Sequence, residues 1–107
     1  MDREIMKGSI DILLLNLLNQ KDMYGYEMVK VLKEKSGALY NMSEGTMYPA
    51  LKRMEKKGWL HSYWSETEHG RRKYYRINAD GETVLETKIS EWKKVNSLIQ
   101  KTSGDLS

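Results

Sequence analysis

The sequence predicts a mainly α-helical fold with a small β-hairpin, namely a winged helix-turn-helix of three helices and a wing, extended by a long C-terminal helix. The first observation is an amphipathic helix pattern over residues 43–58. The second is a pair of short aromatic segments within residues 59–77, separated by turn residues. The third is an apolar repeat at helical spacing over residues 79–101. A helix followed directly by a basic hairpin is typical of a winged helix.

The chain of 107 residues fits one compact unit with a modest core. We expect a winged helix-turn-helix DNA-binding domain over residues 1–78, a dimerisation helix over 79–101 and a flexible tail over 102–107. The longest apolar run, Ile12 to Leu15, is too short to span a membrane. The first residues are acidic where a signal peptide is basic, so we expect a cytoplasmic protein.

The composition argues against several classes of function. Without cysteine, we expect no disulfide framework, no thiolate nucleophile and no cysteine zinc site. His61 and His69 lack a second ligand at metal spacing, so we expect neither a metal nor another cofactor. The chain has no glycine-rich nucleotide loop and no histidine paired with a recognisable nucleophile, which argues against an enzyme.

The first two helices follow from apolar periodicity. The first has its apolar face at Ile10, Leu13, Leu14, Leu17 and Leu18 and ends near Asn19. The second opens at Tyr24, and Ser36 with Gly37 supplies its stop signal. Its apolar positions are Tyr24, Met28, Val31 and Leu32.

The third helix is predicted to begin after Ser43, a good N-cap residue, and to end at Gly58. One face is apolar and is expected in the core: Met47, Ala50, Leu51 and Met54. The other face combines a small residue, an aromatic ring and cations: Gly45, Tyr48, Pro49, Lys52, Arg53 and Lys56. Because proline removes a helical hydrogen bond, we expect Pro49 to bend the first turn or to delay the regular helix.

The hairpin is predicted from residues 59–64 and 71–77, with a tip, residues 65–70, longer than a tight turn. Residues 52–76 hold eight basic side chains against three glutamates, so this segment is net +5 while the whole chain is +3. Positive charge is therefore concentrated on one part of the fold, as a polyanion-binding surface requires. The eight basic residues are Lys52, Arg53, Lys56, Lys57, Arg71, Arg72, Lys73 and Arg76.

The last helix, capped by Asn78, is too long for its own domain to cover. Its apolar stripe steps at the spacing of a helix that packs along another helix. We therefore expect homodimerisation through Leu85, Ile89, Trp92, Val95, Leu98 and Ile99.

Four sequence strings together resemble one known family. They are the leading LLLNLL helix, MYGYEM at residues 23–28, GTMYPALKRMEKKGWL at 45–60 and GRRKYYRI at 70–77. The third string is the most specific. On these strings the chain is identified as similar to PadR-type transcriptional regulators, specifically the short subfamily with a single C-terminal dimerisation helix.

The resemblance implies a dimeric repressor that binds a partly palindromic DNA operator, with the third helix of each subunit in a major groove and the wing alongside. Carried over by position, the DNA-binding residues are Ser43, Thr46, Tyr48, Pro49, Lys52 and Arg53 from the helix and Gly70, Arg71, Arg72 and Lys73 from the wing. Tyr24 and Gly25 are expected to touch phosphates. In the short subfamily a tryptophan can line a pocket at the dimer centre that takes flat aromatic compounds, and Trp92 holds the matching place.

Alternatives stay open at several of these residues. The helix cations also fit a solvated face, and Tyr48 also fits packing against the wing. Trp92 fits a dimer contact without any ligand. Family wings often carry two glycines where His69 and Gly70 stand here. Glu66 and Glu68 at the tip repel phosphate, so we expect residues 71–73 to make the DNA contacts. A winged helix that binds only protein would need an apolar patch on the third helix.

Overall fold

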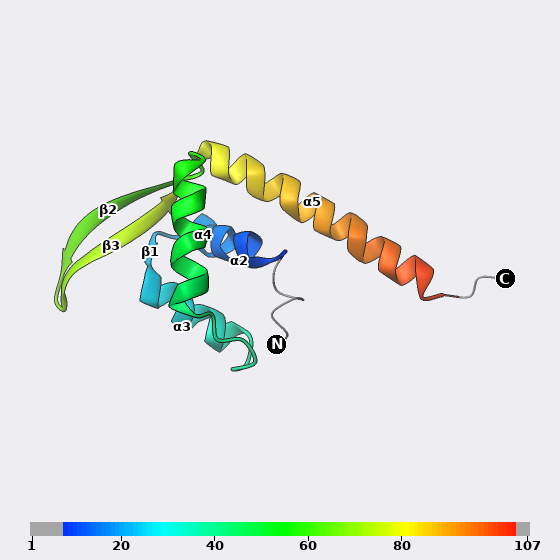
Figure 1. The fold of residues 1–107 in the computed structure, drawn as a ribbon, viewed down its shortest axis with the longest axis horizontal. Helices are drawn as coiled ribbons and strands as arrows, with labels where there is room; N and C mark the ends of the chain where they lie inside the picture. The colour runs from blue at the N-terminus through cyan, green and yellow to red at the C-terminus, as the bar shows by residue number, and fades with distance from the viewer. Residues whose placement is uncertain (1–7, 105–107) are drawn as a thin grey trace.

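The computed structural model describes residues 8–104. The predictions for the acidic N-terminus and for the end of the polar tail fall on residues 1–7 and 105–107, outside the described part. The helices and strands follow one another in the order α2, β1, α3, α4, β2, β3, α5. In Figure 1 the β2–β3 hairpin and α5 extend in opposite directions from the group formed by α2, α3 and α4. This arrangement is the winged helix with a long C-terminal helix that the sequence predicts.

Three helices build the core of the winged helix. They are α2 (Ile10–Gln20), α3 (Gly25–Lys35) and α4 (Glu44–Lys56). The predicted apolar face of α4 is confirmed, since Met47, Leu51 and Met54 are fully buried and Ala50 nearly so. The predicted apolar positions of α2 lie in or against the same core. Hydrophobic burial of these faces is the main force that holds α4 in place.

A third strand joins the predicted hairpin. β1 (Met23–Tyr24) pairs with β3 (Gly70–Ile77), which pairs with β2 (Leu60–Thr67), and all pairs are antiparallel. Tyr24 was expected inside the second helix, but it belongs to this strand, and α3 begins one residue later. Two residues are too few for a strand pattern to appear in the sequence.

The tip of the hairpin is tighter than predicted. Thr67 is in register with Gly70, so only Glu68 and His69 form the loop, and the expected long tip over residues 65–70 is wrong. The Thr67 hydroxyl donates to the Gly70 carbonyl oxygen at 2.6 Å and accepts the His69 N–H at 3.2 Å. These local hydrogen bonds close the turn and extend both strands.

Pro49 lies inside α4, which is continuous from Glu44 to Lys56. The expectation that Pro49 delays the regular helix is therefore wrong. In a regular helix the N–H of residue 49 would donate to the carbonyl of Gly45, four residues earlier, but proline has no N–H. Gly45 and Pro49 are both exposed, so water can satisfy that carbonyl.

α5 (Ala79–Thr102) begins in the core and then leaves it. Asn78 caps it by accepting the Gly81 N–H at 2.8 Å. A β-carbon on Gly81 would lie 2.3 Å from the backbone oxygen of Trp59, so only glycine permits this approach. Leu85 is 3% exposed and belongs to the winged-helix core, which crosses the boundary predicted at residue 78. No helix in the described part of the chain is long and apolar enough to span a membrane.

Candidate nucleic-acid interface

The N-terminus of α4 is held by two of the predicted DNA-binding residues. The Ser43 hydroxyl accepts the Thr46 N–H at 3.2 Å and donates to the Thr46 hydroxyl at 3.0 Å. Glu44 follows in the first turn, where a carboxylate interacts well with the helix dipole. Both hydroxyl groups therefore fix the start of the helix, whatever else they contact.

The predicted exposed face of α4 divides into one ridge and two flanks. At about 100° per residue, Gly45, Pro49, Lys52 and Lys56 lie opposite the buried face, and all four are exposed. Tyr48 and Arg53 lie on the two sides of this ridge. Within residues 8–104 neither Lys52 nor Lys56 takes part in an ion pair, so both cations are open to an external anion.

Arg53 faces α2 and is paired. Its two terminal nitrogens donate to the Asp11 carboxylate at 2.9 and 2.6 Å, a bidentate ion pair across 42 positions of sequence. The hydrogen bond to Asp11 raises the pKa of Arg53 above its usual value and outweighs partial burial. Sequence reasoning placed Arg53 with the DNA-facing cations, but the structure turns it toward the flank that α2 covers.

Tyr48 faces the opposite flank, toward the start of α3. A β-carbon on Gly25 would lie 2.5 Å from the Tyr48 hydroxyl oxygen and 2.9 Å from the end of Met47. Gly25 is buried there, so its lack of a side chain lets the tyrosine ring approach the helix. Tyr48 nevertheless keeps 43% of its surface exposed, which leaves it available to a partner.

The two faces of the β2–β3 hairpin, here called the wing, carry different residues. On the inner face, Leu60 and Tyr75 are buried and the Ser62 hydroxyl donates to the Glu55 carboxylate of α4. Because side chains alternate along a strand, Trp64, Glu66, Arg71 and Lys73 share this inner face. The outer face holds the other set: His61, Tyr63, Ser65, Thr67, Arg72, Tyr74 and Arg76. The adjacent arginines predicted to bind DNA together thus point to opposite faces.

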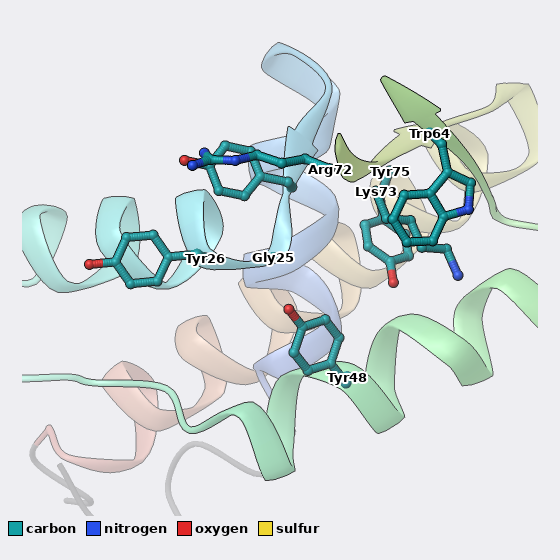
Figure 2. Close-up of a pocket in the computed structure, with 8 residues that line it drawn as sticks. Gly25, Tyr26, Tyr48, Trp64, Arg72, Lys73 and Tyr75 are labelled. Carbon is teal, nitrogen blue, oxygen red and sulfur yellow. The ribbon is translucent and has the colours of Figure 1, made fainter. Parts of the chain in front are cut away.

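A groove of about 460 Å³ lies between α4, the start of α3 and the wing. Both faces of β3 contribute to it, since Lys73 and Tyr75 of the inner face and Arg72 of the outer face line it. Figure 2 shows Tyr48 reaching from α4 toward Gly25, with Trp64, Lys73 and Tyr75 together on another side. Two aromatic side chains of the groove, Tyr26 and Trp64, were not predicted and are 66% and 56% exposed. Strand alternation was a signal that could have placed Trp64 beside Lys73.

The outer face of the wing is occupied by contacts within the protein. Arg76 pairs with the Asp22 carboxylate at 3.0 Å, and the Tyr63 hydroxyl donates to it at 2.5 Å. Partial burial favours the neutral form of Asp22, but the hydrogen bonds from Tyr63 and Arg76 outweigh it and hold its pKa below the usual value. Arg72 lies over the Tyr24 ring at 4.3 Å, so the cations of this face have partners.

The exposed apolar stripe of α5 begins where the core ends. Ile89 is half-buried against the core, whereas Trp92, Val95, Leu98 and Ile99 are each at least 53% exposed. Leu85, predicted with this stripe, lies in the core instead. A cavity of about 380 Å³ between α2 and α5 is lined by Ser9, Ile12, Leu13, Asn16, Ile89, Trp92 and Lys93.

No group of three or more histidine, aspartate or glutamate side chains that could hold a metal ion occurs between residues 8 and 104.

Comparison with known proteins places this geometry in a family. Residues 14–87 match the transcriptional regulator PadR-like family. A transcriptional regulator from Clostridium thermocellum is 38% identical with a TM-score of 0.85, over 92% of this chain and 96% of that one. A PadR family transcription regulator from Clostridium difficile is 41% identical with a TM-score of 0.77, over 90% and 99% of the two chains.

A curated relative from Lysinibacillus sphaericus, itself uncharacterised, is 33% identical over 90% of this chain and 89% of its own length. Family membership carries DNA binding and transcriptional regulation with it and excludes an enzyme, as the sequence predicts. The chain belongs to the PadR-like family of transcriptional regulators.

Proposed function

We propose that this protein is a homodimeric repressor that binds a partly palindromic operator through α4 and the inner face of the wing. The observation that carries the proposal is the position of its free cations. Lys52 and Lys56 on the ridge of α4, and Arg71 and Lys73 on the inner face, have no ion pair among the described residues. Lys52 and Lys56 lie on the ridge, Lys73 lines the groove, and Arg71 is on the same face of the wing as Lys73. Phosphate neutralisation by such cations supplies most non-specific affinity.

Each element has its own role in this proposal. The ridge of α4 enters the major groove, where lysine reads guanine and the small Gly45 permits close approach. Ser43 and Thr46 lie at the N-terminus of α4, and Pro49 lies on its ridge. Tyr48, Gly25 and Tyr24 border the groove toward α3, near the passing phosphates. Arg53 retains donors beyond the two that Asp11 uses, so it contributes from the flank.

Homodimerisation is proposed from the second half of α5. Trp92, Val95, Leu98 and Ile99 would form a large exposed apolar stripe on a monomer, which soluble monomers rarely carry. A second copy of α5 covers it and gives two recognition helices related by a two-fold axis, which fits a partly palindromic operator. Leu98→Asp is expected to give a monomer in analytical ultracentrifugation, and a stable dimer of that variant would contradict this interface.

We further propose that a flat aromatic molecule binds beside Trp92 and releases the DNA. The apolar cavity between α2 and α5 supports this role, since Trp92 lines it and is 53% exposed before a partner is added. A ligand there would change the separation of the recognition helices, which must match half-sites about 34 Å apart. Trp92→Ala should abolish the response to an aromatic inducer and leave basal DNA binding largely intact. Loss of dimerisation in that variant would show that Trp92 is structural.

The proposed location is the cytoplasm, where the operator DNA is found. The test of the central proposal is a fluorescence-anisotropy titration against the DNA upstream of the protein's own gene and against a scrambled duplex. We expect saturable binding of one dimer that prefers the upstream DNA and weakens with salt. No binding to either duplex at low salt would contradict the proposal and favour a module that binds protein.

A further inference from the structure

We propose that Trp64 is a positioning residue that holds Arg71 toward DNA, and that its neighbour Arg72 serves the outer face of the wing. The inference rests on the proposed DNA-binding function and deepens it. It assigns a role to an exposed tryptophan that belongs neither to the core nor to the set of DNA-binding residues predicted from the sequence.

The strand register brings Trp64 and Arg71 together. Trp64 is opposite Lys73 and Glu66 is opposite Arg71, so Trp64 and Arg71 are diagonal neighbours on the inner face. The guanidinium carbon of Arg71 lies 4.9 Å from the centre of the Trp64 ring. At this distance a cation interacts favourably with the face of an indole ring. The stacked guanidinium keeps its edge N–H groups free for an external acceptor.

The competing partner of Arg71 is Glu66, directly across the hairpin on the same face. No ion pair joins them in the described structure, where the ion pairs are Lys21–Glu27, Arg53–Asp11 and Arg76–Asp22. An exposed cross-strand ion pair and an exposed cation–π contact are both weak and similar in strength. Because the two interactions are similar in strength, the presence of the Trp64 ring determines whether Arg71 stacks on it or pairs with Glu66. Without Trp64, Arg71 can turn to Glu66 and lose its contact with DNA.

Arg72 provides the internal comparison. It lies over the Tyr24 ring at 4.3 Å, and Tyr24 meets Tyr74 edge to face with ring centres 5.6 Å apart. This cluster ties β1 to the outer face of β3. Arg72 carries the same charge as Arg71 and is its chain neighbour, but it leaves the other face of β3 and lines the groove beside Tyr24. Arg76 on the outer face pairs with Asp22 and does not line the groove, so Arg76→Ala is the matched control.

The experiment measures affinity for the upstream DNA with Trp64→Ala, Trp64→Phe, Arg71→Ala, Arg76→Ala and the double variant Trp64→Ala/Arg71→Ala. We expect Trp64→Ala and Arg71→Ala each to weaken binding by about 3- to 10-fold, as loss of one oriented phosphate contact would. The double variant should be no weaker than Arg71→Ala, because Trp64 acts through Arg71. Trp64→Phe retains a ring and should restore most of the affinity. Arg76→Ala should stay close to the wild type.

Two results would overturn the proposal. If the two losses add in the double variant, Trp64 contacts DNA itself. If Trp64→Ala binds as the wild type does, Trp64 does not position Arg71. Thermal unfolding of each variant checks that the exposed substitution leaves the fold intact.

A readout without DNA separates this inference from the proposed function. In the free protein the Arg71 side-chain N–H proton should show a ring-current shift in NMR spectra that Trp64→Ala removes. If that shift is present but the wild type binds neither duplex, DNA binding fails as a function and with it the role of the pair. If the shift is absent while the wild type binds, only the positioning role fails.

Discussion

The inner and outer faces of the wing carry similar side chains but differ in what those side chains contact. Each face has two cations and an aromatic cluster within the same two strands. On the outer face Asp22 pairs with Arg76 and binds the Tyr63 hydroxyl, and Tyr24 lies under Arg72. On the inner face, within the described chain, the cations meet only aromatic rings: Arg71 lies over Trp64 and Lys73 over Tyr75.

The difference shows how one basic segment performs two tasks. Asp22 pairs with Arg76 on the outer face and ties the loop before β1 to the wing, so the charge of Arg76 contributes to stability. The inner face has Glu66 but no ion pair, and its cations remain available. Net charge over residues 52–76 therefore overstates the charge that can reach DNA.

The largest effect expected from this comparison is that of charge reversal. Lys73→Glu on the inner face should weaken operator binding by roughly 100-fold, because it removes one phosphate contact and adds repulsion. Arg76→Glu on the outer face is the matched control and should change affinity by less than about 5-fold, since Arg76 does not line the groove and its charge is screened by salt. Fluorescence anisotropy measures both. Equal losses would contradict the division into two faces.

The groove beside the inner face gives the next effect. Gly25→Ala places a β-carbon 2.5 Å from the Tyr48 hydroxyl oxygen, so the ring must move out of its present position. We expect affinity to fall by about 5- to 30-fold, as for the loss of one or two contacts at about 1 kcal/mol each. Thermal unfolding should change little, because alanine favours the helix and the tyrosine can move. Tyr48→Phe distinguishes a role of the hydroxyl from a role of the ring. Wild-type affinity in Gly25→Ala would remove Tyr48 from the interface.

A smaller effect is expected at the flank of α4 that faces away from the wing. Asp11→Asn removes the charge that holds Arg53 and should tighten operator binding by about 2- to 5-fold, the worth of one exposed ion pair. Arg53→Ala should weaken binding by a similar factor. If Asp11→Asn leaves the affinity and its salt dependence unchanged, Arg53 has no part in DNA binding and serves only to join α2 to α4.

The smallest effect concerns stability on the outer face. Asp22→Asn should lower the free energy of unfolding at pH 7 by less than about 1 kcal/mol, because the pair with Arg76 is largely exposed. The pKa of Asp22 is below its usual value, so its ionised form stabilises the fold at neutral pH and that contribution is lost as the pH falls below about 4. Denaturant unfolding at pH 7 and pH 3 should show a smaller difference between variant and wild type at pH 3 than at pH 7. A difference of equal size at both pH values would contradict this role.

Local patterns predicted most of the fold. The buried face of α4, the hairpin and the long α5 each depend on spacing within one segment, and the structure confirms them. Alternation along β3 was also present in the sequence and would have separated Arg71 from Arg72. The net charge of the segment does not reveal this alternation, because the sum takes no account of the direction of each side chain.

The features that were missed depend on contacts between distant segments. β1 exists only because two residues pair with β3, about 50 positions away in the chain. The Arg53–Asp11 pair joins α4 to α2 across 42 positions, and no local pattern announces it. Leu85 continues the apolar stripe of α5, but the close approach of Gly81 to Trp59 brings the first turns of that helix into the core.

The most direct test of the account is the salt dependence of operator affinity for two double variants. Arg71→Ala/Lys73→Ala removes the inner cations, and Arg72→Ala/Arg76→Ala removes the outer ones, with the same change in net charge. If DNA lies against the inner face, the slope of log affinity against log salt falls by about 2 in the inner variant, at about 0.9 per phosphate contact, and by less in the outer one. An equal fall in both variants, or a fall in the outer variant alone, would contradict the proposed interface.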